Sequence, residues 1–199
     1  MGGNDMNAAC SLAHNKDMVT GRRLNAVIGV SFFVLATALG AYVRIPVPGT
    51  PVPITLQTFF VIMAGAVLGR RLGALSQAFY LILGAAGVPV FQGAASGVQY
   101  LAGPTGGYIF GFVIAAYAAG YLSAGIRPSK ASAIASFTLG IIIIYACGVS
   151  HLAMFYGMSL KDAVSIGALP FIPADALKIL LAAAVYSGIS GRARQIFPA

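Results

Sequence analysis

Residues 132–155 read SAIASFTLGIIIIYACGVSHLAMF and contain no Asp, Glu, Lys or Arg. A helix that crosses the hydrocarbon core of a bilayer needs about 20 predominantly apolar residues, so this segment predicts a membrane-spanning helix. The rest of the chain has the same character, because 59% of its 199 residues are hydrophobic and only 8% are charged. A soluble domain carries about 25% charged residues. The sequence therefore predicts an integral membrane protein.

Charged residues and Pro/Gly clusters divide the chain into apolar stretches at about 24–43, 54–69, 72–87, 107–125, 132–155 and 173–190. The second and third are short for a membrane span, so we expect those helices to be tilted, kinked or sheltered by neighbours. A transmembrane barrel would show period-two alternation over segments of about 10 residues, and these stretches show none. The predicted fold class is an all-α integral membrane protein, a six-transmembrane-helix bundle with ordered outer loops.

The predicted membrane domain covers 23–191, between a polar N-terminal tail, 1–22, and a short C-terminal tail, 192–199. Basic residues follow the positive-inside rule if both tails are cytoplasmic, which leaves only Arg44 and Lys161 in outer connections. The cytoplasmic set is Lys16, Arg22, Arg23, Arg70, Arg71, Arg127, Lys130, Arg192 and Arg194. The net charge of +8 is explained by this topology and by lipid headgroups, so no nucleic-acid partner is expected. The first tail has no apolar h-region and predicts no cleavable signal peptide.

Enzyme signatures are missing from the sequence. It has no G-x-x-x-x-G-K-[ST] loop, no H-E-x-x-H and no G-x-S-x-G. Only four carboxylates are present, two of them in the N-terminal tail. The sequence therefore offers no candidate pair of carboxylates for general acid–base catalysis. The cysteines and histidines are isolated and predict neither a disulfide nor a metal site. We expect no catalysis, no cofactor and no metal.

Recognition of a ligand is the remaining kind of function. The outer connections 44–53, 88–106 and 156–172 are rich in Pro and Gly but nearly free of charge. Such long segments are uncommon unless they are functional or disordered. We expect them to fold over the helix ends as a lid, the alternative being loose extracellular loops.

The segment PFIPADALKILLAAAVY, 170–186, places two ionisable residues in an apolar helix. Pro173 suits a first helical turn, where Asp175 is favoured by the helix dipole, and Lys178 lies on the same face. One interpretation is a self-paired structural cap. The other is a ligand site, because ionisable residues inside a membrane are costly and usually functional. An adjacent acceptor and donor complement a cyclic urea or amide.

Three segments resemble one known family: RIPVPGTPVPITLQTFFVIMAGAVLGRRLGALSQAFYLILGAAGVPVF, GPTGGYIFGF and PFIPADALKIL. They are similar to BioY, the biotin transporter family of substrate-binding S-components of energy-coupling factor (ECF) transporters. The resemblance covers about 24–190. It implies six helices in the bacterial cytoplasmic membrane, both termini inside, and biotin held near the outer face as transported substrate. Its P-x-D-x-x-K motif, here Pro173, Asp175 and Lys178, implies contact with the ureido ring, and its members work with a T-component and an ATPase.

Other candidate ligand contacts rest on residue chemistry. Amide and phenol groups at Gln57, Gln92 and Tyr100 can hydrogen-bond the ureido group or the valerate, or else cap a loop. Arg44 either attracts the valerate carboxylate or snorkels to the interface. Apolar walls for the thiophane ring and alkyl chain are predicted at Phe91 and Tyr108.

Small residues on the first helix are candidates for docking the T-component, because close helix approach in lipid depends on them. The family's Ala-x-x-x-Ala spacing is matched only approximately, by Ala36 and Gly40. The alternative is that these residues serve packing inside the chain's own bundle. The alternatives to a biotin subunit are a transporter of another small vitamin, a facilitator without a partner, and an unrelated channel or structural protein. A channel should show polar residues recurring along several helices, and the first, second and fourth stretches show almost none.

Overall fold

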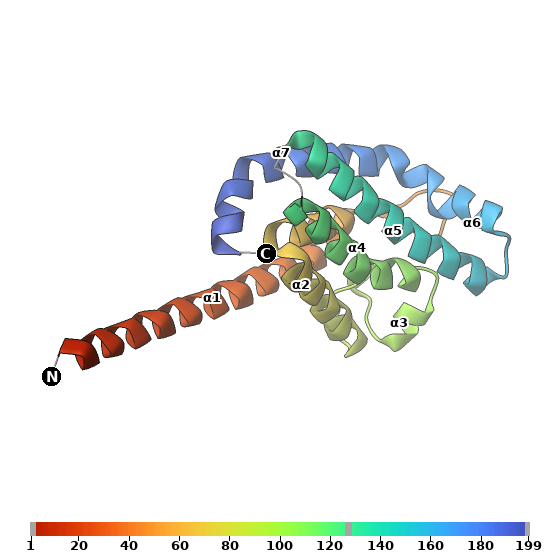
Figure 1. Cartoon of the computed structure of the whole chain (residues 1–199). Coiled ribbons are helices and arrows are strands. Elements are labelled where there is room, and N and C mark those ends of the chain that lie inside the picture. The colour runs from red at the N-terminus through yellow and green to blue at the C-terminus, as the bar shows by residue number, and fades with distance from the viewer. Residues whose placement is uncertain (1–2, 126–128, 198–199) are drawn as a thin grey trace.

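The structure is a computed structural model that describes residues 3–125 and 129–197, with side chains for 21–124 and 129–197. Arg127, predicted to be cytoplasmic, lies outside the described residues. The described chain is almost entirely helical (Figure 1). Its elements are α1 (Gly3–Tyr42), β1 (Arg44–Ile45), β2 (Ile54–Thr55), α2 (Gln57–Ala85), the 3₁₀ turn η1 (Gln92–Ala94), α3 (Val98–Ala102), α4 (Gly106–Gly125), α5 (Lys130–Tyr156), α6 (Leu160–Gly167), the 3₁₀ turn η2 (Leu169–Phe171) and α7 (Ile172–Ile196). Helix α1 begins inside the predicted N-terminal tail, and α7 continues into the predicted C-terminal tail.

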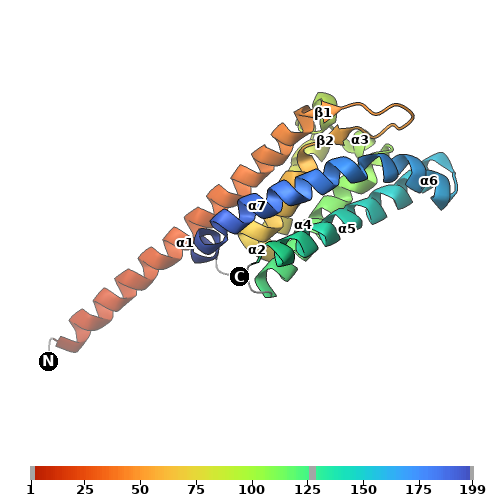
Figure 2. The same cartoon turned by 90° about the horizontal axis from the view of Figure 1, so that it is seen from above.

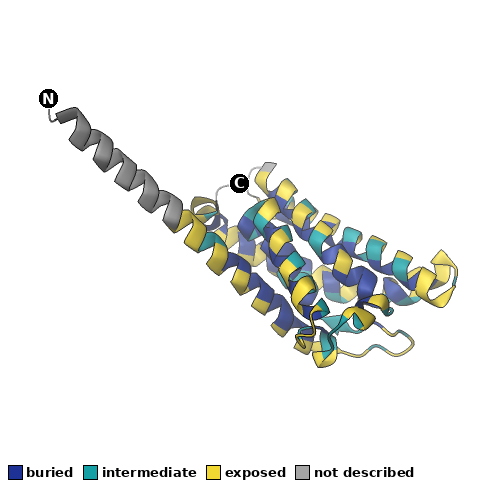
Figure 3. Cartoon of the chain, turned by 90° about the horizontal axis from the view of Figure 1, so that it is seen from below, coloured by how far each residue is buried: buried dark blue, intermediate teal, exposed yellow. Residues whose placement is uncertain are grey.

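Five helical segments among the described residues are long and apolar enough to cross a membrane: 21–42, 57–85, 106–124, 130–156 and 160–196. Large apolar side chains are exposed along their outer faces (Figure 3). On α1, Leu35 and Leu39 are 63% and 67% exposed. A soluble monomer rarely exposes such continuous apolar surface, so this surface is suited to contact with lipid.

Helix α2 reverses direction at Gly69. This residue has φ 80° and ψ 170°, a conformation that is essentially restricted to glycine. Gln57 Nε2 and Tyr80 OH, 23 positions apart, lie 2.6 Å from each other, whereas an unbroken helix would separate the two residues by about 35 Å. The α2 segment is therefore two antiparallel halves, 57–68 and 70–85, which correspond to the short stretches 54–69 and 72–87 of the sequence.

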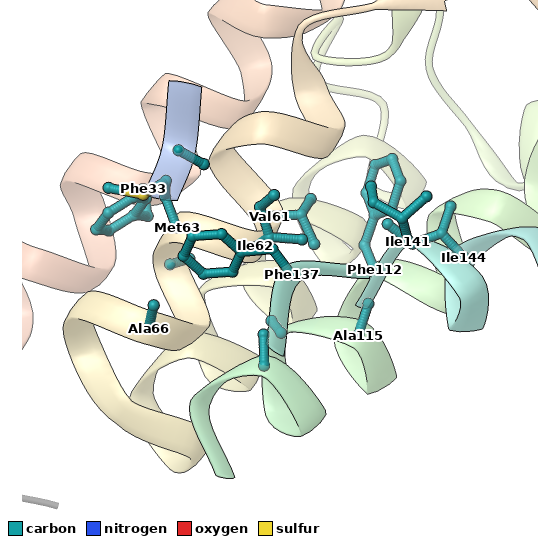
Figure 4. Close-up of a cluster of buried hydrophobic side chains, with 14 of the residues drawn as sticks. Phe33, Val61, Ile62, Met63, Ala66, Phe112, Ala115, Phe137, Ile141 and Ile144 are labelled. Atoms are coloured by element: carbon teal, nitrogen blue, oxygen red, sulfur yellow. The ribbon is translucent and has the colours of Figure 1, made fainter. Parts of the chain in front are cut away.

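Glycine allows these halves and α4 to approach closely. A Cβ atom on Gly73 would lie 2.6 Å from the Cα of Gly65, and one on Gly65 would lie 2.1 Å from the carbonyl oxygen of Ala116. Small residues provide such close helix contacts in lipid. Helix α4 packs most extensively against α2 and α5. Apolar side chains from α1, α2, α4 and α5 fill the core between these helices (Figure 4): Phe33, Val61, Ile62, Met63, Phe112, Phe137, Ile141 and Ile144.

The ordered connections lie together at the end of the bundle remote from the C-terminus (Figure 2). Strands β1 and β2 form an antiparallel pair in which Arg44 is opposite Thr55 and Ile45 is opposite Ile54. Segments η1 and α3 form the connection between α2 and α4, and α6 with η2 forms the connection between α5 and α7. The connections 88–106 and 156–172 thus contain helical turns, and the connection 44–53 begins in the β1–β2 pair.

Candidate functional site

A cavity that is partly open to solvent lies beneath these connections; its empty space, including the open solvent at its mouth, is about 560 Å³. Its lining comes from the β1–β2 connection, from α2, α4, α5 and α7, and from the segment around η1 and α3. The lining residues are Val52, Pro53, Thr55, Gln57, Thr58, Gln92, Tyr100, Thr105, Tyr108, Ile109, Phe112, Ile144, Tyr145, Phe171, Asp175 and Lys178.

Asp175 and Lys178 form the charged part of this lining. Asp175 lies in the first turn of α7 and is 4% exposed. Lys178 Nζ donates to Asp175 Oδ1 at 2.7 Å and to Thr58 Oγ1 at 3.1 Å. Thr58 in turn donates to the same Oδ1 at 3.1 Å, and the hydroxyl of Tyr145 donates to Oδ2. The carboxylate is therefore held by three donors from three helices.

This arrangement retains hydrogen-bonding capacity. An ammonium group has three N–H donors and a carboxylate has about four acceptor positions, and the contacts above use two and three of them, respectively. Asp175 and Lys178 pair with each other, as the structural interpretation requires, yet both also line the cavity. A cavity wall that offers one acceptor beside one donor suits a neutral group carrying N–H next to C=O.

Gln57 stands at the start of α2 and is 5% exposed. Its Nε2 donates to Tyr80 OH at 2.6 Å, and its Oε1 accepts from Thr55 Oγ1 at 3.2 Å. Both Gln57 and Thr55 line the cavity, whereas Tyr80 lies behind it. The amide is therefore fixed in direction before any ligand arrives.

Tyr100 on α3 presents a buried hydroxyl to the cavity, where Thr105 and Gln92 are its polar neighbours. Its ring stacks on Phe91 at a centroid distance of 5.1 Å. Burial raises the pKa of the Tyr100 phenol above its ordinary value, and hydrogen bonding by Thr105 and Gln92 offsets part of that effect. A buried hydroxyl on a cavity wall is suited to bind a polar ligand atom.

Tyr108 contributes a wall and not a free hydroxyl. Its OH donates to the carbonyl oxygen of Gly167 at 2.8 Å, and its ring lies where a Cβ atom on Gly148 would be, 2.2 Å from that position. The ring of Tyr108 faces the cavity beside Ile109 and Phe112. Tyr108 therefore lies on the cavity wall, and its packing against a ligand stays a prediction.

Phe91 and Arg44 do not line the cavity. Phe91 is fully buried behind Tyr100, and its ring would be 2.0 Å from a Cβ atom on Gly84. Arg44 lies exposed in β1, with Nη1 2.8 Å from the Cβ position of Gly93. Phe91 therefore supports the aromatic stack behind Tyr100, which corrects its predicted contact with the ligand. Arg44 lies beside η1, near enough for its charge to act on Tyr100, and its attraction of a ligand carboxylate stays a prediction.

The two predicted docking residues lie inside the chain's own bundle. Ala36 is 8% exposed and Gly40 is buried. A Cβ atom on Gly40 would be 3.0 Å from both the backbone nitrogen of Gln57 and the ring of Phe60. Gly40 admits the start of α2, so the structure favours the alternative that this pair serves packing inside the chain's own bundle.

Sequence reasoning missed Thr58 and Tyr145, which complete the shell around Asp175. Tyr145 follows four isoleucines in α5, and Thr58 follows Gln57 directly. A polar group inside a membrane segment is a functional signal in itself. That signal was present at both positions, but pairing them with Asp175 requires the helix packing.

These features define a class: a helical membrane protein with a partly open cavity, lined by polar and apolar side chains, at one end of its bundle. The sequence profile of the BioY family matches residues 13–195. The chain belongs to the BioY family, which confirms the resemblance seen in the sequence. Members of this family are transporters and not enzymes.

Individual relatives agree with this assignment. The chain is 42% identical to the biotin transporter BioY of Thermotoga maritima over 162 residues, which cover 81% of this chain and 94% of that protein. It is 36% identical to the biotin transporter BioY of Rhizobium etli over 165 residues, 79% of this chain and 88% of that protein. Its fold matches the crystal structure of the S-component for biotin from an ECF-type ABC transporter. That match has a TM-score of 0.78 at 24% identity and covers 85% of this chain and 92% of the other.

Proposed function

We propose that the cavity binds biotin and that the chain is the substrate-binding membrane subunit of a biotin uptake system. The observation that carries the proposal is the cluster of Asp175, Lys178, Thr58 and Tyr145 on the wall of a cavity. The ureido group of biotin offers two N–H donors and one carbonyl oxygen within one planar ring. Asp175 accepts from an N–H, and Lys178 donates to the carbonyl oxygen.

The remaining lining suits the rest of the ligand. Tyr108, Ile109, Phe112 and Ile144 offer apolar surface for the thiophane ring and the alkyl chain. Gln92 and the hydroxyl of Tyr100 offer polar contacts near the connections. Small-molecule sites commonly combine apolar walls with a few convergent polar groups in this way.

We propose six membrane crossings, because the α2 segment folds back on itself at Gly69 and so contributes two. These half-helices are short, and their outer ends meet the folded connections around the cavity. Basic residues of the Gly69 turn, of the start of α5 and of the end of α7 lie at the end remote from the cavity. By the positive-inside rule that end is cytoplasmic, so the cavity opens outward from the bacterial cytoplasmic membrane.

Uptake against a gradient needs energy that this chain does not supply, since its sequence carries no phosphate-binding loop. We propose that a separate ATPase acts through a transmembrane T-component. Ala36 and Gly40 are not offered as the docking surface. One alternative is facilitated transport without partners, which an uptake assay with the chain alone tests. The other is transport of another small vitamin, which the binding experiment below tests.

Binding by purified protein tests the proposal. Isothermal titration in detergent should give one biotin per chain without nucleotide. Lipoate is the matched control, because it has a similar acyl chain but no ureido ring, and it should not compete. Thiamin and riboflavin should not bind. Failure to bind biotin, or equal binding of lipoate, would overturn the proposed ligand.

A further inference from the structure

One buried tyrosine controls which atom of Gln57 faces the cavity. Tyr80 is fully buried in the second half of α2 and does not line the cavity. Its hydroxyl donates to the carbonyl oxygen of Val90 at 3.0 Å and accepts from Gln57 Nε2 at 2.6 Å. Because the phenol has a single proton, the contact with Val90 fills its donor role, and toward Gln57 its oxygen accepts.

Proton counting fixes the direction of the Gln57 amide. A backbone carbonyl can only accept, so the Tyr80 proton is committed to Val90, and Gln57 must meet the phenol oxygen with an N–H. The flipped amide would place two acceptors, Gln57 Oε1 and Val90 O, against one phenol proton. One buried acceptor would then be unsatisfied, at a cost of about 1–3 kcal/mol.

The fixed direction turns the carbonyl oxygen of Gln57 toward the ligand side. Oε1 lies beside Thr55, which lines the cavity, while Nε2 lies beside Tyr80, which does not. Thr55 occupies one acceptor position of Oε1, and a carbonyl oxygen has two. Gln57 therefore presents an acceptor to the cavity.

The ring of Tyr80 is held so that its hydroxyl cannot turn away. It contacts Phe91 edge-on at a centroid distance of 5.6 Å and Phe112 at 6.4 Å. Val90 belongs to the connection between α2 and α3 that contains η1. A hydrogen bond from Gly97 N to Gly84 O, at 2.7 Å, holds this connection against the end of α2. The direction of the Gln57 amide thus depends on the position of this connection.

We infer that Tyr80 is a positioning residue that fixes Gln57 as a hydrogen-bond acceptor for one ureido N–H, while Asp175 accepts from the other. This inference rests on the proposed function and adds a source of specificity to it. A ligand that presents an acceptor at this position would face the Gln57 oxygen without a proton between them. The site therefore selects a ring with two N–H donors.

Tyr80→Phe tests the inference, because it removes the hydroxyl and keeps the ring. The probes are biotin and its two cyclic carbamate analogues, in each of which one ureido N–H is replaced by an oxygen atom without added bulk. Competition binding should show Tyr80→Phe weakening biotin about 10-fold. For the carbamate that lacks the N–H facing Gln57, the same substitution should change affinity less than about 2-fold, whereas a merely structural role would weaken all three ligands alike.

A double-mutant comparison provides the second measurement. In a Gln57→Met background, Tyr80→Phe should cause no further loss of biotin affinity if Tyr80 acts through Gln57. Tyr186→Phe, at a buried tyrosine near the other end of the bundle, is the matched control and should leave biotin affinity unchanged. Equal losses for biotin and both carbamates, additive losses in the double mutant, or no loss at all would overturn the inference. Absence of biotin binding by the wild-type protein would overturn the proposed function itself, and this inference with it.

Discussion

The hydroxyl of Tyr145 on α5 donates a hydrogen bond to Oδ2 of Asp175 on α7, while Lys178 and Thr58 share Oδ1. Two helices that are not adjacent in sequence to α2 therefore meet it at one carboxylate. The contact sets the orientation of Asp175 and limits which of its acceptor positions a ligand can use. It also connects the charged pair to the long apolar helix from which the sequence analysis began.

Replacing Tyr145 by Phe should weaken biotin binding about 10-fold, or about 1.4 kcal/mol. The ring and its packing stay, but Oδ2 loses its donor, and the carboxylate can rotate away from the ligand-binding direction. Titration calorimetry measures the loss. Tyr117→Phe, on the exposed face of α4, is the control and should bind like the wild type. Unchanged affinity in Tyr145→Phe would show that the hydrogen bond serves the fold alone.

The double substitution Asp175→Asn with Lys178→Met separates ligand contact from helix capping. Each single change leaves one uncompensated charge in a low dielectric, so each should destabilise the protein. The double change removes both charges and should recover much of the stability. We expect it to bind biotin at least about 10-fold more weakly, a loss of about 1.4 kcal/mol or more. The paired measurements are thermal unfolding in detergent and biotin titration; a stable double mutant with wild-type affinity would contradict a ligand-binding role for the pair.

Local patterns in the sequence were sufficient for the helices and for the charged pair. Apolar runs predicted the membrane segments, and i,i+3 spacing placed Asp175 and Lys178 on one face. Local patterns could not predict which residues of other helices contact Asp175, because Thr58 is 117 positions from it and Tyr145 is 30 positions away. Phe91 shows that a position in a loop predicts proximity to a site but not the direction of a side chain. Gly40 shows that a small residue predicts a close contact but does not identify the contacting segment.

Cysteine labelling tests the orientation of the bundle. In a background without Cys10 and Cys147, single cysteines at Gly21 and Gln195 should react with an impermeant maleimide only after the cytoplasmic side is opened. Cysteines at Gln99 and Lys161, near the cavity end, should react in intact cells. All four positions are exposed, and none of them is a glycine with a positive φ. A single position that labels clearly from the opposite side would exclude the proposed six-crossing arrangement.

Substituting Gly69 by Ala should destabilise the protein by about 1–3 kcal/mol, because its φ of 80° and ψ of 170° lie in a region that Cβ makes costly. No neighbouring atom lies within 4 Å of the added Cβ position, so the effect would come from the backbone and not from a clash. The strain acts on the turn that sets the two α2 halves antiparallel, and hence on the meeting of Gln57 with Tyr80. Gly21→Ala is the matched control, since that glycine is helical, equally uncrowded and at a negative φ, and it should be neutral or slightly stabilising. Thermal unfolding with and without biotin distinguishes the two substitutions. Equal stability of Gly69→Ala and Gly21→Ala would mean that the reversal at Gly69 does not depend on a glycine.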